Sequence, residues 1–186
     1  MRLFIAINFK SGIKSGLIAL RNSLRSRSER GNFPRDENLH LTLAFIGETS
    51  PKKADAIMAA MDAVTFAPLA ATVDRLGTFS RGTLWWAGLR EDAPLMDLQR
   101  EITHKLALSG FETDSRKYSP HITIGREVVT DAKPWNIAPL SETACAIDLM
   151  KSERTDGKLT YTAIFTRGAI DCYYKKDTPN YRASPR

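Results

Sequence analysis

Histidine and cysteine are scarce in this chain of 186 residues, which contains three histidines and two cysteines. Cys145 and Cys172 are too few for a disulfide framework or a cysteine-rich zinc site, so we expect two unpaired thiols in a reducing cytoplasm. Histidine pairs at metal-ligand spacing, such as His-x-His or His-x-x-x-His, are also missing from the two histidine motifs described below. The sequence therefore predicts a protein that uses no metal and no cofactor.

Long hydrophobic runs are absent as well. The apolar stretch at residues 3–9 is too short for a membrane span or the core of a signal peptide, so we expect no membrane contact and a cytoplasmic protein. A hydrophobic content of 42% suffices for a folded interior. We expect one bilobal domain over residues 1–170, a polar basic tail over residues 171–186, and a monomer.

Negative charge is outweighed by positive charge, with a formal net charge of +6 and a pI of about 9.4. This balance favours a polyanionic partner such as RNA. Part of the excess lies in five arginines that precede the first motif, where they form either a rim that attracts phosphate or a solvated surface: Arg21, Arg25, Arg27, Arg30 and Arg35.

Two of the three histidines open the same four-residue phrase, once in residues 40–43 (His-Leu-Thr-Leu) and once in residues 121–124 (His-Ile-Thr-Ile). In each copy polar and aliphatic residues alternate, which is typical of a half-buried strand. The histidine and threonine of each copy then share one face. If the two strands lie side by side, two imidazoles and two hydroxyls converge on one pocket.

Such a pocket suits a phosphate ester. Histidine titrates near neutral pH, so one imidazole can act as base while the other acts as acid. Threonine hydroxyls can donate hydrogen bonds to the non-bridging phosphate oxygens, where negative charge develops in the transition state.

The remaining periodicity predicts strands and helices in two similar halves. Strands are expected over residues 3–9, 39–46, 69–79, 83–89, 121–128, 143–151 and 158–166, and helices over 13–27, from 51 onward and over 94–109. Residues 28–38 are expected to form a loop and residues 132–136 a short helical segment. One of the adjacent Trp85 and Trp86 must face away from the core, either as a base-stacking platform or beneath a helix. The order predicts an α+β fold, a bilobal pseudo-twofold pair of antiparallel sheets with helices outside and a cleft between.

With these motifs in place, the sequence resembles the two-histidine (2H) phosphoesterase superfamily and, within it, the LigT/ThpR group of RNA 2′,3′-cyclic phosphodiesterases, formerly called 2′-5′ RNA ligases. The resemblance covers roughly residues 2–168. It is carried by five segments in family order: residues 2–7 (RLFIAI), 37–47 (ENLHLTLAFIG), 84–89 (LWWAGL), 118–126 (YSPHITIGR) and 149–152 (LMKS).

This resemblance implies specific roles for the site residues. His40 would be the general acid toward the departing ribose 3′ oxygen and His121 the base that activates water, which gives a 2′-phosphate without a metal. Thr42 and Thr123 would hold the phosphate. Arg126 would join them only if the strand bulges at Gly125 or ends there, because strict alternation places it on the face opposite His121. Phe9 and Tyr118 are further candidates, as base-stacking neighbours.

Several alternatives remain open at this point. The substrate could be a small cyclic nucleotide or a 2′-5′ oligonucleotide instead of an RNA end. The same residues could run the reverse reaction, 2′-5′ ligation. A non-catalytic module that binds RNA ends would need the hydroxyls and cations but not two titrating imidazoles, and an inactive α+β domain would need none of these groups.

Overall fold

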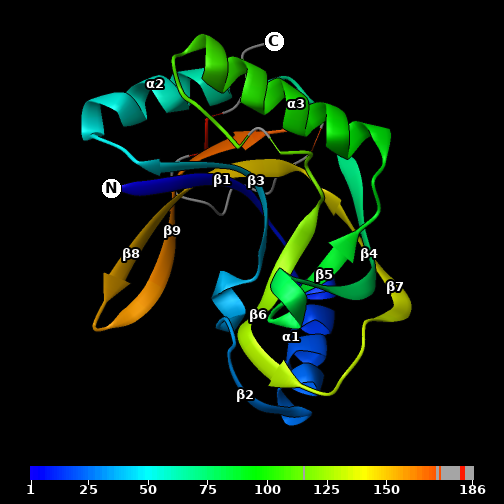
Figure 1. Cartoon of the computed structure of the whole chain (residues 1–186). Helices are drawn as coiled ribbons and strands as arrows, with labels where there is room; N and C mark the ends of the chain where they lie inside the picture. The colour runs from blue at the N-terminus through cyan, green and yellow to red at the C-terminus, as the bar shows by residue number, and fades with distance from the viewer. Residues whose placement is uncertain (115, 171, 173–180, 183–186) are drawn as a thin grey trace.

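Two five-stranded sheets dominate the computed structural model, which describes residues 1–114, 116–170, 172 and 181–182 (Figure 1). The first sheet has the order β10-β9-β8-β1-β3 and the second the order β2-β6-β5-β4-β7. The strands are β1 (Arg2–Asn8), β2 (Ser28–Asn32), β3 (His40–Glu48), β4 (Leu69–Phe79), β5 (Leu84–Leu89), β6 (His121–Thr130), β7 (Trp135–Ala144), β8 (Ala146–Thr155), β9 (Lys158–Gly168) and β10 (Tyr181–Arg182).

The sheets confirm the pseudo-twofold α+β fold. The order β9-β8-β1-β3 in the first sheet matches β7-β4-β5-β6 in the second, and all these pairs are antiparallel. The two motif strands, β3 and β6, occupy equivalent places at the ends of these two series. The chain completes its first sheet only with strands from its last third, so both halves must fold together.

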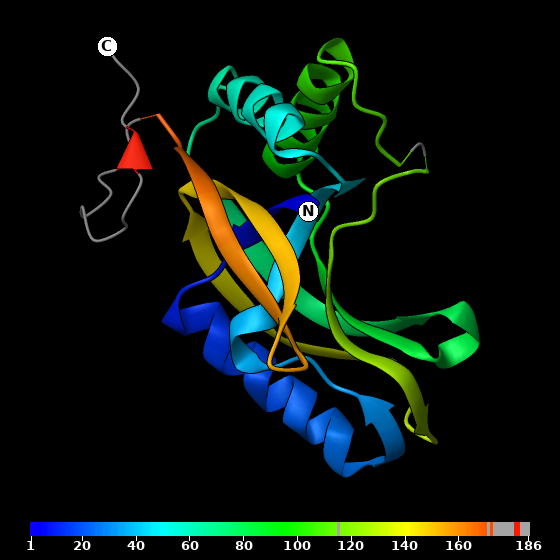
Figure 2. The ribbon, with the colours of Figure 1, turned by 90° about the vertical axis from the view of Figure 1, so that its left-hand side faces the viewer.

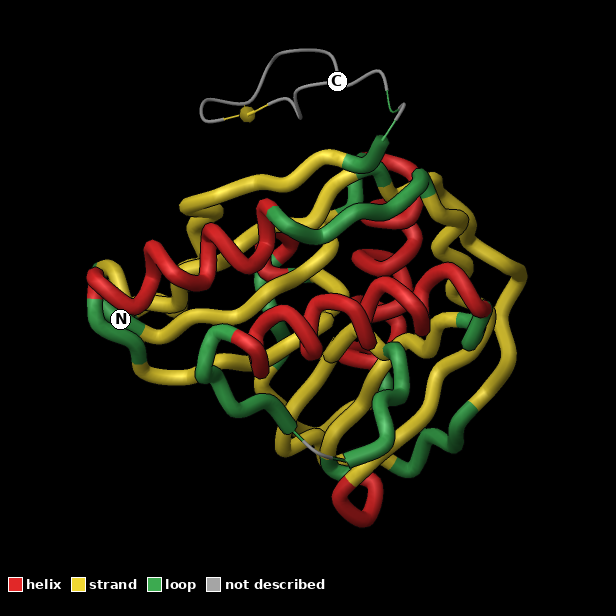
Figure 3. Tube along the Cα trace, turned by 90° about the horizontal axis from the view of Figure 1, so that it is seen from above, coloured by secondary structure: helices red, strands yellow, loops and turns green. Residues whose placement is uncertain are grey.

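Three helices pack on the outer faces, as the sequence predicts. Helix α1 (Ser11–Ser26) contacts β6 and β7 of the second sheet, whereas α2 (Pro51–Asp62) and α3 (Ala93–Leu108) contact each other and strands β9 and β3 respectively. Figure 3 shows α2 and α3 lying across the strands. Each of these two helices has a side-chain N-cap: Ser50 accepts a hydrogen bond from the amide of Lys53, and Asp92 one from that of Leu95.

Three local predictions are wrong. Residues 28–32 form edge strand β2, because they pair with β6, and residues 36–38 form a 3₁₀ turn, η1 (Asp36–Asn38), where a loop was expected. Strand β7 begins at Trp135, so residues 132–136 are not helical. The strand expected from residue 143 starts at Ala146, because residues 143 and 144 belong to β7. Edge pairing of this kind depends on a partner distant in sequence.

The two cysteines are not free thiols. Cys145 and Cys172 form a disulfide with a Cα–Cα distance of 5.9 Å, which fixes the chain beyond β9 to the β7–β8 junction. Two cysteines therefore form a single bridge, although they are too few for a framework. Most of the predicted tail lies outside the described residues, apart from Cys172 and strand β10. Within the described part of the chain, no helix is long and apolar enough to cross a membrane.

Candidate active site

A pocket of about 840 Å³ lies between the two sheets and contains both motifs. His40 and Thr42 from β3, and His121 and Thr123 from β6, all line it. The structure therefore brings together the four side chains that the repeated phrase predicts. Four cations also line the pocket, Arg2, Arg35, Arg126 and Lys158, and no carboxylate does so among the residues described. The electrostatic field of the pocket thus favours an anion.

Matching bulges place one further side chain from each motif strand in this pocket. Between Thr42 and Ala44, and between Thr123 and Gly125, the middle residue has no partner across the ladder. A bulge shifts the side-chain alternation by one residue. Phe45 and Arg126, each five residues after its histidine, consequently return to the pocket face. The condition set by the sequence for Arg126 is met.

Both histidines are held by the same local contact. Nδ1 of His40 lies 2.8 Å from the carbonyl oxygen of Asn38, and Nδ1 of His121 lies 2.7 Å from that of Ser119, in each case two residues earlier. Because a carbonyl only accepts, Nδ1 carries the proton and Nε2 is left for a ligand. In the free protein, the Thr42 hydroxyl lies 3.0 Å from Nε2 of His40 and can donate to it.

Burial dominates the electrostatics of His40. Desolvation, aided by the charges of Lys14 and Arg126, lowers its pKa to about 4, although the Asn38 carbonyl acts in the opposite direction. His40 is therefore neutral at pH 7 in the free protein. Any step in which it donates a proton requires that a ligand first raise its pKa.

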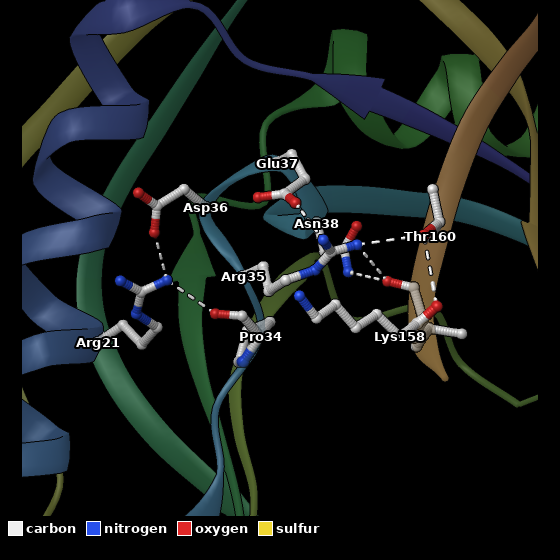
Figure 4. A network of polar contacts seen from close by, with 9 residues as sticks. Arg21, Pro34, Arg35, Asp36, Glu37, Asn38, Lys158 and Thr160 are labelled. Carbon is white, nitrogen blue, oxygen red and sulfur yellow. Dashed lines mark hydrogen bonds and ion pairs between the residues drawn. The ribbon is translucent and has the colours of Figure 1, made fainter. Parts of the chain in front are cut away.

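The carbonyl that holds His40 belongs to a braced segment at residues 34–38 (Figure 4). Arg21 of α1 is 8% exposed, donates to the carbonyl of Pro34 at 2.7 Å and pairs with Asp36 at 2.6 Å. On the other side, the side chain of Asn38 donates to the carbonyl of Leu159 at 3.0 Å. In Figure 2 the tip of the β8–β9 hairpin lies next to this segment. The position of His40 thus depends on helix α1 and on β9.

Arg35 extends the same bracing into the pocket. Its guanidinium donates to the Leu159 carbonyl at 2.7 Å and to the Thr160 hydroxyl at 3.2 Å, and it pairs with Glu37 at 2.8 Å. Of the five arginines considered as a phosphate-attracting rim, Arg35 is the one that lines the pocket. Arg21, by contrast, is a buried structural residue.

Aromatic rings flank each histidine. The His40 ring lies between Phe4, at a centroid distance of 4.8 Å, and Tyr161, at 5.2 Å. His121 faces the edge of Phe79, at 5.2 Å and 90°. Both imidazoles are therefore fixed on two sides, by the backbone carbonyl and by rings. Trp86 is the outward-facing tryptophan, and it packs on Phe79 at 5.0 Å instead of beneath a helix.

Two of the sequence candidates are not in the pocket. Phe9 is 5% exposed and belongs to the main hydrophobic core, so it cannot stack on a base. Tyr118 packs against the same core, and its hydroxyl donates to the carbonyl of Thr42 at 2.9 Å. Burial also raises the pKa of this phenol. Tyr118 instead connects the loop before the second motif to the strand of the first.

Sequence reasoning missed several residues that line the pocket. Phe4 and Tyr161 come from strands β1 and β9, and no local signal in the sequence places their rings beside His40. Phe45 could have been found, because it has the same offset from His40 as Arg126 has from His121. Further lining residues that were not among the sequence candidates include Arg2, Asn38 and Lys158.

Among the described side chains, no group of three or more histidine, cysteine, aspartate or glutamate residues is arranged to hold a metal ion. The polar side chains that line the pocket are imidazoles, hydroxyls, amides and cations.

A sequence model described as the 2′-5′ RNA ligase superfamily matches residues 14–156. The chain belongs to the 2′-5′ RNA ligase superfamily. An RNA 2′,3′-cyclic phosphodiesterase of Escherichia coli is 31% identical over 170 residues, which span 88% of this chain and 93% of that protein. One of Geobacillus stearothermophilus is 33% identical over 129 residues, 67% of this chain, but the match spans only 41% of that longer protein.

Solved structures of this superfamily share the architecture. The crystal structure of E. coli LigT complexed with 3′-AMP has a TM-score of 0.79 and 27% identity, and the alignment covers 91% of this chain and 98% of LigT. The superfamily fold is therefore present nearly end to end in both chains. The bilobal pair of sheets expected from the resemblance is confirmed.

Proposed function

We propose that this protein hydrolyses a terminal 2′,3′-cyclic phosphate of RNA to a 2′-phosphate by acid–base catalysis. The observation that carries the proposal is the convergence of His40, Thr42, His121 and Thr123 on one cationic pocket. The relatives named RNA 2′,3′-cyclic phosphodiesterase support the same reaction.

In the proposed mechanism, Nε2 of His121 takes a proton from a water molecule that attacks the phosphorus atom. The bond between phosphorus and the 3′ oxygen breaks, and His40 delivers a proton from Nε2 to that oxygen. The products are a 2′-phosphate and a free 3′-hydroxyl. The balance requires one water molecule and leaves the two histidines with their protons exchanged, so they must re-equilibrate before the next turnover.

The charge that develops on the phosphate needs donors that are already in place. Thr42 and Thr123 provide hydroxyls, and Arg126 provides a guanidinium that can bind two oxygens at once. Thr42 would exchange its contact with His40 for one with the phosphate, which frees Nε2 of His40. An anion beside Nε2 also offsets the charge of Arg126 that lowers the His40 pKa. Ligand binding would thereby prepare His40 as the acid.

The pocket also suits the nucleoside part of the substrate. Phe45 and Tyr161 present rings to it, and these replace Phe9 and Tyr118 as our candidates for stacking on the terminal base. E. coli LigT was crystallised with 3′-AMP, a ligand of this class.

Three further expectations from the sequence stay proposals. We propose one domain over residues 1–170 followed by a tail, and a monomer. A cytoplasmic location is also proposed, although the Cys145–Cys172 disulfide removes the unpaired thiols that supported it.

The test is incubation of the protein, in EDTA, with an oligoribonucleotide that ends in a 2′,3′-cyclic phosphate. The product is then treated with a phosphatase specific for 3′-phosphates. A ring-opened, resistant end supports the proposal with His40 as the acid. A 3′-phosphate would exchange the two histidine roles. Hydrolysis confined to small cyclic nucleotides would favour the alternative substrate class, and binding without hydrolysis would favour the RNA-end module.

A further inference from the structure

A second cavity, of about 540 Å³, lies on the second sheet beside the active site. Its lining includes Arg75 and Thr78 of β4, Trp86 of β5, and Asn136 of β7. Trp86 forms the boundary with the active site, because the centroid of its ring lies 6.5 Å from that of His121. The two cavities are therefore neighbours on one surface.

The strand register shows that this surface is continuous with the catalytic face. Asn136 pairs with Arg75, Arg75 with Gly88, and Gly88 with His121. Residues directly opposite each other in an antiparallel sheet point to the same side. Figure 1 shows β6, β5, β4 and β7 side by side in this order. With strands about 4.8 Å apart, Arg75 lies about 10 Å from His121 and Asn136 about 14 Å.

Gly77 and Gly88 leave space on this face of the sheet for the ring of Trp86. A Cβ atom at Gly77 would lie 2.2 Å from the Trp86 ring, and one at Gly88 would lie 2.7 Å from it. Trp86 thus lies flat across β4 and β5, with Phe79 packed on it. Phe79 is 38% exposed, and the indole nitrogen of Trp86 is buried without a partner among the described residues. Proteins commonly bind single-stranded RNA through exposed aromatic rings, on which bases stack, and nearby cations, which contact the phosphates.

Toward β8, the pocket face of the first sheet is less suited to a phosphate backbone. Beyond His40 and Thr42, its pocket face carries the carboxylate of Asp148, which accepts hydrogen bonds from Asn8 at 2.7 Å and from Thr166 at 2.6 Å. A carboxylate repels phosphate. On the second sheet, the carboxylate beside Arg75, that of Asp74, is paired with both Arg75 and Arg90.

We propose that the second cavity binds the nucleotides that precede the terminal cyclic phosphate, so that one RNA strand runs from His121 across β5 and β4 toward Asn136. This inference rests on the proposed function and makes the substrate class more specific: an oligoribonucleotide end, not a mononucleotide. Phe79 and Trp86 stack on a base, and Arg75 neutralises a backbone phosphate.

The test compares kcat/KM for cytidine 2′,3′-cyclic phosphate with kcat/KM for a tetraribonucleotide that ends in the same group. We expect the tetranucleotide to be better by at least about fivefold, the low end of what one stacked base contributes. Arg75→Ala should remove most of this gain. Arg90→Ala is the matched control, because Arg90 also pairs with Asp74 but does not line the cavity. Asn136→Glu, at an exposed position, should remove the gain by repulsion, which provides a second variant should Arg75→Ala fail to fold.

Equal kcat/KM for the two wild-type substrates would overturn the proposal while leaving the phosphodiesterase intact. Equal losses of the gain in the Arg75 and Arg90 variants would overturn it too, since charge in general would then be the cause. If Arg75→Ala lowers kcat/KM for both substrates by the same factor, the residue acts through His121 and not on the RNA. Hydrolysis of neither substrate by the wild-type protein would refute the proposed function and this subsite with it.

Discussion

Phe45 and Arg126 occupy equivalent positions in the two halves of the molecule. Each lies five residues after the histidine of its strand, beyond a bulge that follows the motif threonine, and each lines the pocket. One is a ring, over which the guanidinium of Arg2 lies at 4.9 Å, and the other is a cation. The two halves thus share a backbone arrangement but differ in side-chain chemistry: the ring of Phe45 is suited to a base, and the guanidinium of Arg126 is suited to a phosphate.

Arg126→Ala should raise KM for a cyclic phosphate substrate by about 10-fold or more. A hydrogen bond to a charged group contributes roughly 1.5–3 kcal/mol, and this substitution removes the guanidinium that the bulge brings to the phosphate. Arg126→Lys should recover part of the loss, because it keeps the charge but not the two-pronged geometry. The control is Arg100→Ala on the exposed face of α3, which should match the wild type in steady-state kinetics. A wild-type KM in the Arg126→Ala protein would remove this residue from the site.

His40→Ala and His121→Ala should each lower kcat by at least about 100-fold, the usual scale of acid–base catalysis. His104→Ala is the matched control, because the third histidine is exposed on α3 and lies outside the pocket. Single-turnover assays avoid a limit set by product release. Either motif variant turning over at the wild-type rate would exclude that histidine from the mechanism.

Binding of an anion should be linked to protonation of His40. The free His40 has a pKa of about 4, and an anion beside Nε2 raises it. Affinity should therefore increase as pH falls from the bound pKa toward 4, and level off below 4, where the free form is protonated too. Sulfate is a suitable probe because it does not titrate in this range, and its Kd can be measured from pH 4 to 8.

His40→Asn provides the control for this linkage. In that variant the part of the pH dependence that belongs to His40 should disappear. If wild type and His40→Asn show the same pH dependence, His40 stays neutral with the anion bound. It would then be the base, and His121 the acid.

The sequence predicted the parts of this site that depend on local pattern. Alternation in residues 40–43 and 121–124 was enough to place the histidine and threonine of each motif on one face, and the helices α2 and α3 were marked by their apolar periodicity. The bulge at Gly125 could be stated only as a condition, because a bulge is defined by the register of a partner strand. Phe4 and Tyr161 were missed for the same reason: they meet beside His40 only because β1 pairs with β8 across more than 140 residues, and β8 in turn pairs with β9.

Aromatic residues near a motif were the least predictable. Phe9 follows β1 and Tyr118 precedes β6, so both are close in sequence to the site, but the core takes the ring of Phe9 and packs against that of Tyr118. Whether such a ring is buried depends on the direction in which the chain turns at the end of the strand. No local spacing in a single sequence indicates that direction. The disulfide was missed because its partners, 27 residues apart, meet only after β8 and β9 have paired.

Tyr118→Phe should destabilise the protein by about 1–2 kcal/mol, although Tyr118 does not itself line the pocket. Its hydroxyl donates to the carbonyl of Thr42 at 2.9 Å, and removing the donor leaves that partly buried acceptor without this partner. Urea unfolding should show a lower midpoint with an unchanged slope. Tyr161→Phe is the matched control, since that tyrosine lines the open pocket and should lose little stability. Equal midpoints for Tyr118→Phe and the wild type would mean that the two motifs are held together by packing alone, and that the hydrogen bond between them makes no net contribution.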